Sequence, residues 1–223
     1  MGLRFPRLRA HTHCGRNFFR SNFFTQTNTT GGQRMTAQHT SESRLQVHDR
    51  TFRPYILRDE VQQMVRAVAK QINHDFAGKE VTLLVVLKGA MVFAAALMRL
   101  LDVPVTIETI RASSYRNSVR SSGTVSIEDW VPDVDGRHVI LVEDIVDSGT
   151  TITELVKYLS SYQPASVAVA ALLSKPDIHQ GRIQIDYAGR DIAPDFVVGY
   201  GLDYAGYGRQ LDAIWIEDET LDT

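Results

Sequence analysis

Cysteine is nearly missing from this chain of 223 residues, which holds only Cys14. A single thiol excludes an internal disulfide, and such scarcity is typical of reducing compartments, so we expect a cytoplasmic protein. Long apolar runs are missing as well. The longest extends from Ala90 to Met98, whereas a membrane-spanning helix needs ~20 apolar residues. The sequence therefore predicts no membrane segment and no membrane partner.

Acidic residues are missing from the N-terminal part of the chain. Residues 1–41 hold six arginines and no Asp or Glu. The rest of the chain therefore holds 18 of the 24 basic residues and all 26 acidic residues. An acidic body argues against nucleic acid as a partner. Residues 1–45 show no sustained periodicity, and we interpret them as a disordered extension. Two explanations stay open, an organelle transit peptide or an extension upstream of a true start at Met35, and we favour the second.

The remaining residues, 46–223, are enough for one domain with a full core. Apolar periodicity predicts strands that alternate with helices, which indicates an α/β fold with a doubly wound, mostly parallel sheet. A polar stretch over Ser113–Thr124 predicts a mobile loop. The expected helices cover Asp59 to Gly78, Ala90–Leu101 and Thr151–Leu159. The expected strands cover Val81–Leu87, Val105–Ile110, Val139–Val142 and Ser166–Leu173, with shorter ones over Ile183–Ile185, Phe196–Val198 and Ala213–Ile216.

The stretch Val139–Thr151 carries the most information about function. An apolar run rich in β-branched residues ends in Glu143 and Asp144, Asp147 follows, and then comes a Ser-Gly-Thr-Thr turn. Such a turn at the start of a helix offers free backbone N–H groups to a phosphate. Carboxylates beside a phosphate repel it unless they grip sugar hydroxyls, hold Mg²⁺ or move a proton. A phosphorylated ribose is one ligand that needs all of these.

Two further strand ends carry polar residues, Lys88-Gly89 and Ser174-Lys175. In an open parallel sheet, ligands bind beyond the carboxyl ends of the strands. We therefore expect these residues to share one edge, and one site, with the acidic segment.

The segment Val142–Thr151 resembles the ribose-phosphate signature of the type I phosphoribosyltransferases. Other segments are similar to the hypoxanthine-guanine branch of that family, and the similarity extends over about residues 47–217. These segments are Leu87-Lys88-Gly89, Ser114-Tyr115, Leu173-Ser174-Lys175, Phe196 to Tyr200, and Leu202-Asp203-Tyr204 with Arg209. The resemblance implies the family's doubly wound sheet with a small hood.

The resemblance assigns roles to the acidic segment. Glu143 and Asp144 would bind the ribose hydroxyls, directly or through Mg²⁺-bound water. Asp147 would act as general base or acid at purine N7. The 5′-phosphate would be held by Asp147, Ser148, Gly149, Thr150 and Thr151. A simpler interpretation makes Ser148 an ordinary helix N-cap, and both can hold together.

The resemblance also assigns the other ligand groups. Pyrophosphate would bind Lys88, Gly89 and Arg209, and the peptide bond before Lys88 can be cis in the family. The purine would bind Lys175, Phe196 and Val197. Asp203 would join Glu143 and Asp144 as a Mg²⁺ ligand, and Ser114 and Tyr115 would belong to a lid.

The function implied is purine salvage, in which phosphoribosyl pyrophosphate and a 6-oxopurine give a nucleotide and pyrophosphate. Lys175 argues against adenine, because its ammonium needs an acceptor at the 6-position. A xanthine-preferring transferase and a non-catalytic nucleotide sensor on the same fold stay open. The resemblance further implies a homodimer or homotetramer.

Overall fold

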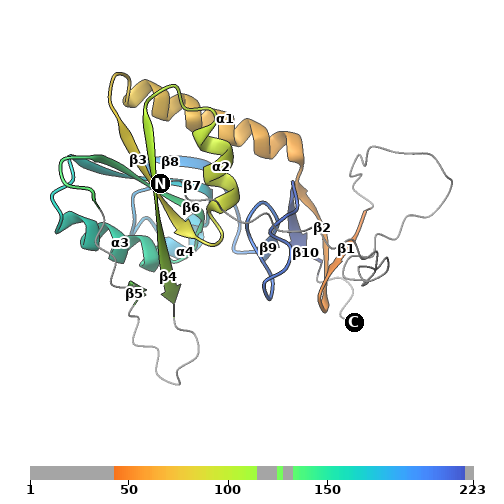
Figure 1. The fold of residues 1–223 in the computed structure, drawn as a ribbon. Helices are drawn as coiled ribbons and strands as arrows, with labels where there is room; N and C mark the ends of the chain where they lie inside the picture. The colour runs from red at the N-terminus through yellow and green to blue at the C-terminus, as the bar shows by residue number, and fades with distance from the viewer. Residues whose placement is uncertain (1–42, 115–124, 128–132, 219–223) are drawn as a thin grey trace, which may run out of the picture.

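The computed structural model describes residues 43–114, 125–127 and 133–218. They form a large sheet covered by helices and a smaller sheet beside it (Figure 1). The predicted interpretation of residues 1–45 falls almost wholly outside the described residues and stays a prediction.

The large sheet is parallel over five of its six strands, as the alternation of strands and helices predicted. Only β5, at one edge, runs antiparallel to its neighbour β4. In spatial order the strands are β5 (Val125–Ile127), β4 (Val105–Ser114), β3 (Val81–Leu87), β6 (His138–Val146), β7 (Ser166–Ser174) and β8 (Tyr187–Asp191). Strand β3 and the Val139–Val142 part of β6 are buried on both faces, which a parallel sheet with helices on both sides requires.

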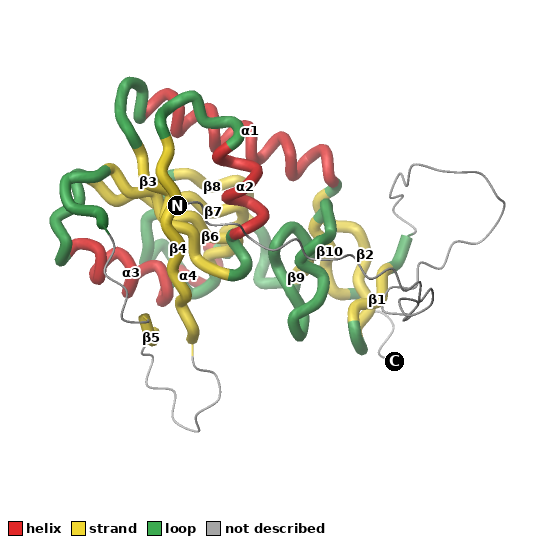
Figure 2. Tube along the Cα trace, in the orientation of Figure 1, coloured by secondary structure: helices red, strands yellow, loops and turns green. Residues whose placement is uncertain are grey.

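Helices cover both faces of this sheet (Figure 2). The helices are α1 (Arg58–Asp75), α2 (Met91–Met98), α3 (Thr150–Ser160) and the short α4 (Pro176–His179). Apolar residues of α1 and α2 pack in one core cluster, and those of α3 pack in a second cluster on the other face. Helix α1 begins where Glu60 accepts a hydrogen bond of 2.9 Å from the Leu57 N–H. No helix of the described residues is long and apolar enough to cross a membrane.

The smaller sheet, which we call the hood, joins the two ends of the described chain. It contains, in spatial order, β1 (Leu45–Val47), β2 (Arg50–Ile56), β10 (Ile214–Glu217) and β9 (Val197–Val198). All of its pairings are antiparallel. Phe52 and Trp215 are fully buried in its core.

Several predicted boundaries were wrong. Strand β6 continues to Val146, because its pairing with β7 extends that far, so Glu143 and Asp144 lie within the strand and not after it. Strand β4 continues past Ile110 because it pairs with β3 as far as Arg111 and then with β5.

Three further differences concern shorter elements. Helix α2 ends at Met98, before the predicted Leu101. The strand expected over Ile183–Ile185 is absent from the structure at those described residues. Ile183 and Ile185 lie in a loop and pack against the core cluster that contains the apolar residues of α3. The strand follows this loop, at the more polar Tyr187–Asp191. Strands β1 and β2 were not predicted, because an edge hairpin of mixed polarity has weak periodicity.

Candidate active site

The carboxyl ends of β3, β6 and β7 meet at one edge of the large sheet, as expected. The Lys175 N–H donates to the Val146 carbonyl at 2.9 Å, which joins the segment after β7 to the end of β6. Gly89, just after β3, lies so close to Asp144 that an added Cβ would overlap the Asp144 carboxylate. The structure therefore brings together the three segments that the sequence singled out.

Lys175 and Asp147 form an ion pair at this edge. The Lys175 Nζ lies 2.9 Å from Oδ1 of Asp147. The Lys175 side chain is buried, with 8% exposed, whereas that of Asp147 is 47% exposed. The pair is close but lacks hydrogen-bond geometry, and this buried oxygen accepts no hydrogen bond from the described residues. Oδ1 of Asp147 is therefore stabilised by the charge of Lys175 and remains able to accept a hydrogen bond.

Glu143 and Asp144 are half-buried, and one carboxyl oxygen of Glu143 is fully buried. Burial raises the pKa of Glu143 well above its usual range, and the neighbouring Asp144 adds to this rise. Burial likewise raises the pKa of Asp144 to about 6. The hydrogen bond that Asp144 accepts from the Ile145 N–H lowers the pKa but does not offset burial. Within the described part of the chain, Glu143 Oε2 is buried without a hydrogen-bond partner. Such groups are expected where a polar ligand supplies the missing partners.

The turn after Asp147 opens helix α3 without a capping side chain at its N-cap position. The N-cap residue is Gly149, at φ +76°, which has no side chain to cap the helix. The interpretation of Ser148 as the N-cap was therefore wrong, although its hydroxyl still accepts a hydrogen bond from the Thr150 N–H at 3.4 Å and pairs with Thr150 Oγ1 at 3.0 Å. Because the first four N–H groups of a helix lack intrahelical partners, this helix start is suited to an anion.

The loop after β3 is fixed by two close backbone approaches. The Leu87–Lys88 peptide bond is cis, as the resemblance implied was possible. Gly201 packs so tightly against Gly89 that a Cβ on Gly201 would overlap the Gly89 carbonyl oxygen. Gly201 has φ +107°, a conformation that side-chain-bearing residues rarely adopt. Asp144, Gly89 and Gly201 therefore form a continuous stack.

Arg209 and Asp203 continue this stack. Arg209 Nη1 donates to the Gly201 carbonyl at 2.6 Å, and its Nη2 lies 2.5 Å from Asp203 Oδ1. The other oxygen of Asp203 accepts from the Gly206 N–H at 2.7 Å. The residue predicted to hold pyrophosphate thus pairs directly with one predicted to hold Mg²⁺.

The two residues predicted to bind the base lie on the hood. Val197 is buried in β9 and pairs with Ile216. Phe196 precedes this strand with 39% of its surface exposed. Within the described residues no hydrogen bond, ion pair or ring contact joins Phe196 to Lys175, so their meeting around a base stays a prediction. Ser114 ends β4, and Tyr115 lies outside the described residues, so the lid also stays a prediction.

The acidic groups of the site fit a Mg²⁺ ion shared with a ligand. No cluster of three or more His, Cys, Asp or Glu side chains suited to a metal occurs among the described residues. Mg²⁺ is usually held by one or two carboxylates together with water and substrate phosphates. The unpartnered oxygen of Glu143 matches this need, whereas Asp203 would have to share its oxygens with Arg209 and the Gly206 N–H.

Sequence reasoning missed Gly201, although its neighbours were singled out. The Gly-Tyr-Gly segment at 199–201 gave a signal, because two closely spaced glycines indicate close backbone approaches. It also missed Arg50 of the hood, whose guanidinium carbon lies 5.4 Å from the centre of the Phe196 ring. A lone arginine in a short strand carries no sequence signal for such a contact.

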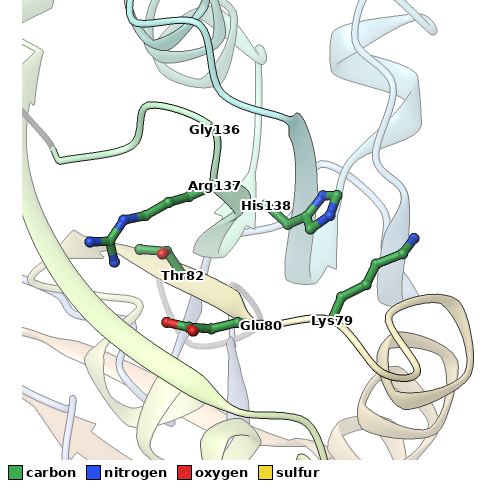
Figure 3. A pocket seen from close by; sticks show the side chains of 6 residues that line it. All are labelled: Lys79, Glu80, Thr82, Gly136, Arg137 and His138. Atoms are coloured by element: carbon green, nitrogen blue, oxygen red, sulfur yellow. The ribbon is translucent and has the colours of Figure 1, made fainter.

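A cavity of about 390 Å³ lies at the opposite edge of the sheet, far from these groups in the topology. Figure 3 shows its six lining residues, which come from the starts of β3 and β6. Three of its polar side chains are already engaged: Arg137 pairs with Asp133, His138 with Ser166 and Thr82 with Thr106. We therefore place the active site at the carboxyl edge.

Comparison with known proteins shows the family of this chain. The phosphoribosyl transferase domain model matches residues 57–205. The hypoxanthine-guanine phosphoribosyltransferase of Mycobacterium tuberculosis is 42% identical over 163 residues, which cover 70% of this chain and 81% of that protein. The Streptococcus pneumoniae enzyme of the same name is 37% identical over 73% of this chain and 91% of its own. A crystal structure of a Bacillus anthracis hypoxanthine-guanine phosphoribosyltransferase matches with a TM-score of 0.69 and 38% identity, over 73% of this chain and 96% of the other. This chain belongs to the phosphoribosyl transferase domain family and, within it, to the hypoxanthine-guanine phosphoribosyltransferases.

Proposed function

We propose that this chain transfers the 5-phosphoribosyl group from phosphoribosyl pyrophosphate to hypoxanthine or guanine, which gives IMP or GMP and pyrophosphate. The observation that carries the proposal is the Asp147–Lys175 ion pair directly before the start of α3. The pair supports the proposal because it joins a carboxylate that can exchange a proton to an ammonium that can donate to a 6-oxo oxygen, just before a helix start suited to a phosphate. The names of the relatives support the same reaction.

In this proposal the phosphoribosyl group is held by backbone and acidic groups. The 5′-phosphate accepts hydrogen bonds from the turn Ser148–Thr151, where Gly149 lets the backbone come close. The ribose hydroxyls donate to Glu143 and Asp144, which gives the unpartnered Glu143 Oε2 a partner. The pyrophosphate lies between the Lys88-Gly89 loop and Arg209.

The base is recognised by Lys175 and activated by Asp147. The Lys175 ammonium has three donors and no acceptor, so it favours a 6-oxo oxygen over a 6-amino group. The reaction passes through an oxocarbenium-like state at ribose C1′, and the purine becomes a better nucleophile as it loses a proton. Asp147 accepts that proton at N7, a step that a positioned carboxylate accelerates by about 10²–10⁴-fold. Phe196 stacks on the ring, and the Val197 backbone contacts its pyrimidine edge.

We propose Mg²⁺ as the cofactor, held by Asp203 and by the Glu143–Asp144 pair together with substrate oxygens. When bound, the ion neutralises the negative charge of the pyrophosphate group. The residues of this chain then bind, orient and exchange a proton as described above.

An assay of the purified chain with phosphoribosyl pyrophosphate, Mg²⁺ and one base at a time tests the proposal. Hypoxanthine and guanine should give the nucleotide, and adenine should give none. Faster turnover of xanthine than of hypoxanthine would make it a xanthine-preferring enzyme. No turnover of any base, with nucleotide still bound, would contradict the proposal and favour a sensor.

A further inference from the structure

Arg50 of β2 lies over two aromatic rings of the hood. Its guanidinium carbon is 5.4 Å from the centre of the Phe196 ring and 4.5 Å from that of the Tyr204 ring. The two rings meet edge to face, with centres 5.8 Å apart and planes at 84°. Arg50 therefore contacts the faces of two rings that also contact each other, and both distances are within the range of cation–π attraction.

Glu217 holds Arg50 in this position. The Arg50 Nη1 lies 3.0 Å from each of the two carboxylate oxygens of Glu217. The same Glu217 donates its backbone N–H to the Phe196 carbonyl at 3.0 Å. Glu217 thus fixes the backbone of Phe196 directly and its ring through Arg50. The two contacts leave the ring little freedom, although 39% of Phe196 remains exposed.

We propose that Arg50, held by Glu217, is a positioning residue that presets the Phe196 ring to receive the purine base. This inference rests on the proposed function, in which Phe196 stacks on the base. Arg50 covers ring surface from the β2 side, and the exposed part of Phe196 stays open to a ligand. A cation that orders the ring before binding removes part of the ordering cost, which is the general basis of preorganisation.

The Arg50 cluster also reaches the loop that carries Asp203. Tyr204 follows Asp203 directly, and the centre of its ring lies 4.5 Å from the Arg50 guanidinium carbon. The β1–β2 hairpin thereby holds the residue next to a proposed metal ligand. The main effect of Arg50 should nevertheless be on the base, because its ring contact with Phe196 is direct.

The test compares steady-state kinetics of Arg50→Met with those of the unaltered chain. The KM for hypoxanthine should rise about three- to tenfold, the cost of immobilising one side chain. The KM for phosphoribosyl pyrophosphate and kcat should each change less than about twofold, because Arg50 touches no reacting group and orders only the ring that receives the base. Arg53→Met is a matched control, because Arg53 is exposed on the same strand and forms no ion pair within the described residues. Arg50→Lys keeps the cation and should recover part of the lost affinity.

A double-variant cycle separates positioning from a general effect on the fold. In a Phe196→Leu background, Arg50→Met should no longer change the KM for hypoxanthine. An equal rise in both backgrounds would overturn the inference, since Arg50 would then act without the ring. If Arg50→Met does not fold, Glu217→Gln should give the same selective rise, and an unchanged KM in that variant would equally overturn it.

The same experiment distinguishes this inference from the proposed function. If Phe196→Leu raises the KM for hypoxanthine but Arg50→Met does not, the inference fails and the base-binding role of Phe196 stands. If Phe196→Leu leaves that KM unchanged, the stacking role assigned to Phe196 is wrong, and the inference fails with it. An unaltered chain that turns over no base contradicts the proposed function itself.

Discussion

The ammonium of Lys175 lies 2.9 Å from the carboxylate of Asp147, with the lysine buried and the aspartate half exposed. In the proposed reaction both groups face the same base, one at its 6-oxo oxygen and the other at N7. Because an ammonium has three donors, Lys175 can bind the base while it remains beside Asp147. The two residues therefore form one unit, and each can be tested by its effect on a different kinetic property.

Asp147→Asn should lower kcat by about 10²–10⁴-fold, because an amide cannot accept the purine proton as a carboxylate does. The affinity for phosphoribosyl pyrophosphate should stay within a few-fold of normal, since the start of α3 is unchanged. Single-turnover kinetics together with calorimetric binding separates the two effects. Near-normal turnover would exclude Asp147 as the proton-transfer group.

Lys175→Gln should lower kcat/KM for hypoxanthine and guanine by roughly 10–100-fold, because a charged hydrogen bond contributes about 1.5–3 kcal/mol. Turnover of adenine should gain relative to both, since a glutamine amide offers an acceptor as well as a donor. Competition assays with pairs of bases measure this ratio. An unchanged preference for hypoxanthine over adenine would show that another group reads the 6-position.

Much of this arrangement could be predicted from the sequence, because parallel strands with apolar interiors bring their carboxyl ends to one edge. The boundaries of β3 were correct to the residue, since Val81–Leu87 is apolar and is followed by Lys88-Gly89. The end of β6 was not predictable in this way. Glu143 and Asp144 have no strand preference of their own, and pairing with β7 keeps them extended.

The contacts between distant segments could not be predicted from local patterns. Gly201 lies against Gly89 only because the hood is seated beside the large sheet, and no periodicity reports that contact. The same holds for Arg50, whose partners Phe196 and Glu217 lie far along the chain. Local sequence thus singled out candidate site residues, whereas tertiary packing decides which distant residues contact them.

Gly201→Ala should disrupt the pyrophosphate loop, because its Cβ would overlap the carbonyl oxygen of Gly89. We expect kcat/KM for phosphoribosyl pyrophosphate to fall by about 10–100-fold, as misplacement of a binding loop by ~1 Å is enough for such losses. Gly206→Ala is the matched control. Gly206 also has a positive φ, of +89°, but no atom lies within 4 Å of its added Cβ.

Both glycine variants should lose stability from the strained backbone, by about 1–2 kcal/mol. Only Gly201→Ala should also lose affinity for the pyrophosphate substrate. Thermal unfolding and kinetics measured side by side separate these effects. Equal kinetic losses in the two variants would mean that backbone strain, and not the contact with Gly89, is responsible.

Asp144→Asn should stabilise the free chain at pH values above about 4, and we expect it to abolish ribose and metal binding. Burial raises the pKa of Asp144 from 3.8 to about 6 in the folded chain. Between these two values the folded state binds more protons than the unfolded state, so stability falls as pH rises. Above about pH 6 the carboxylate is charged in both states, and the full penalty, about 3 kcal/mol, is present.

Urea unfolding at pH 4, 5, 6, 7 and 8 measures this difference between Asp144→Asn and the unaltered chain. The advantage of the variant should be smallest at pH 4, grow to about pH 6 and then stay constant. Asp75→Asn is a control of opposite sign, because hydrogen bonds from His74 and Tyr187 lower the pKa of Asp75. The stability that Asp75 contributes should be lost as pH falls. A difference between Asp144→Asn and the unaltered chain that does not vary with pH would show that burial of the Asp144 charge does not destabilise the free site. The acidic pair would then hold its charge before any ligand arrives, and proton release would not accompany binding.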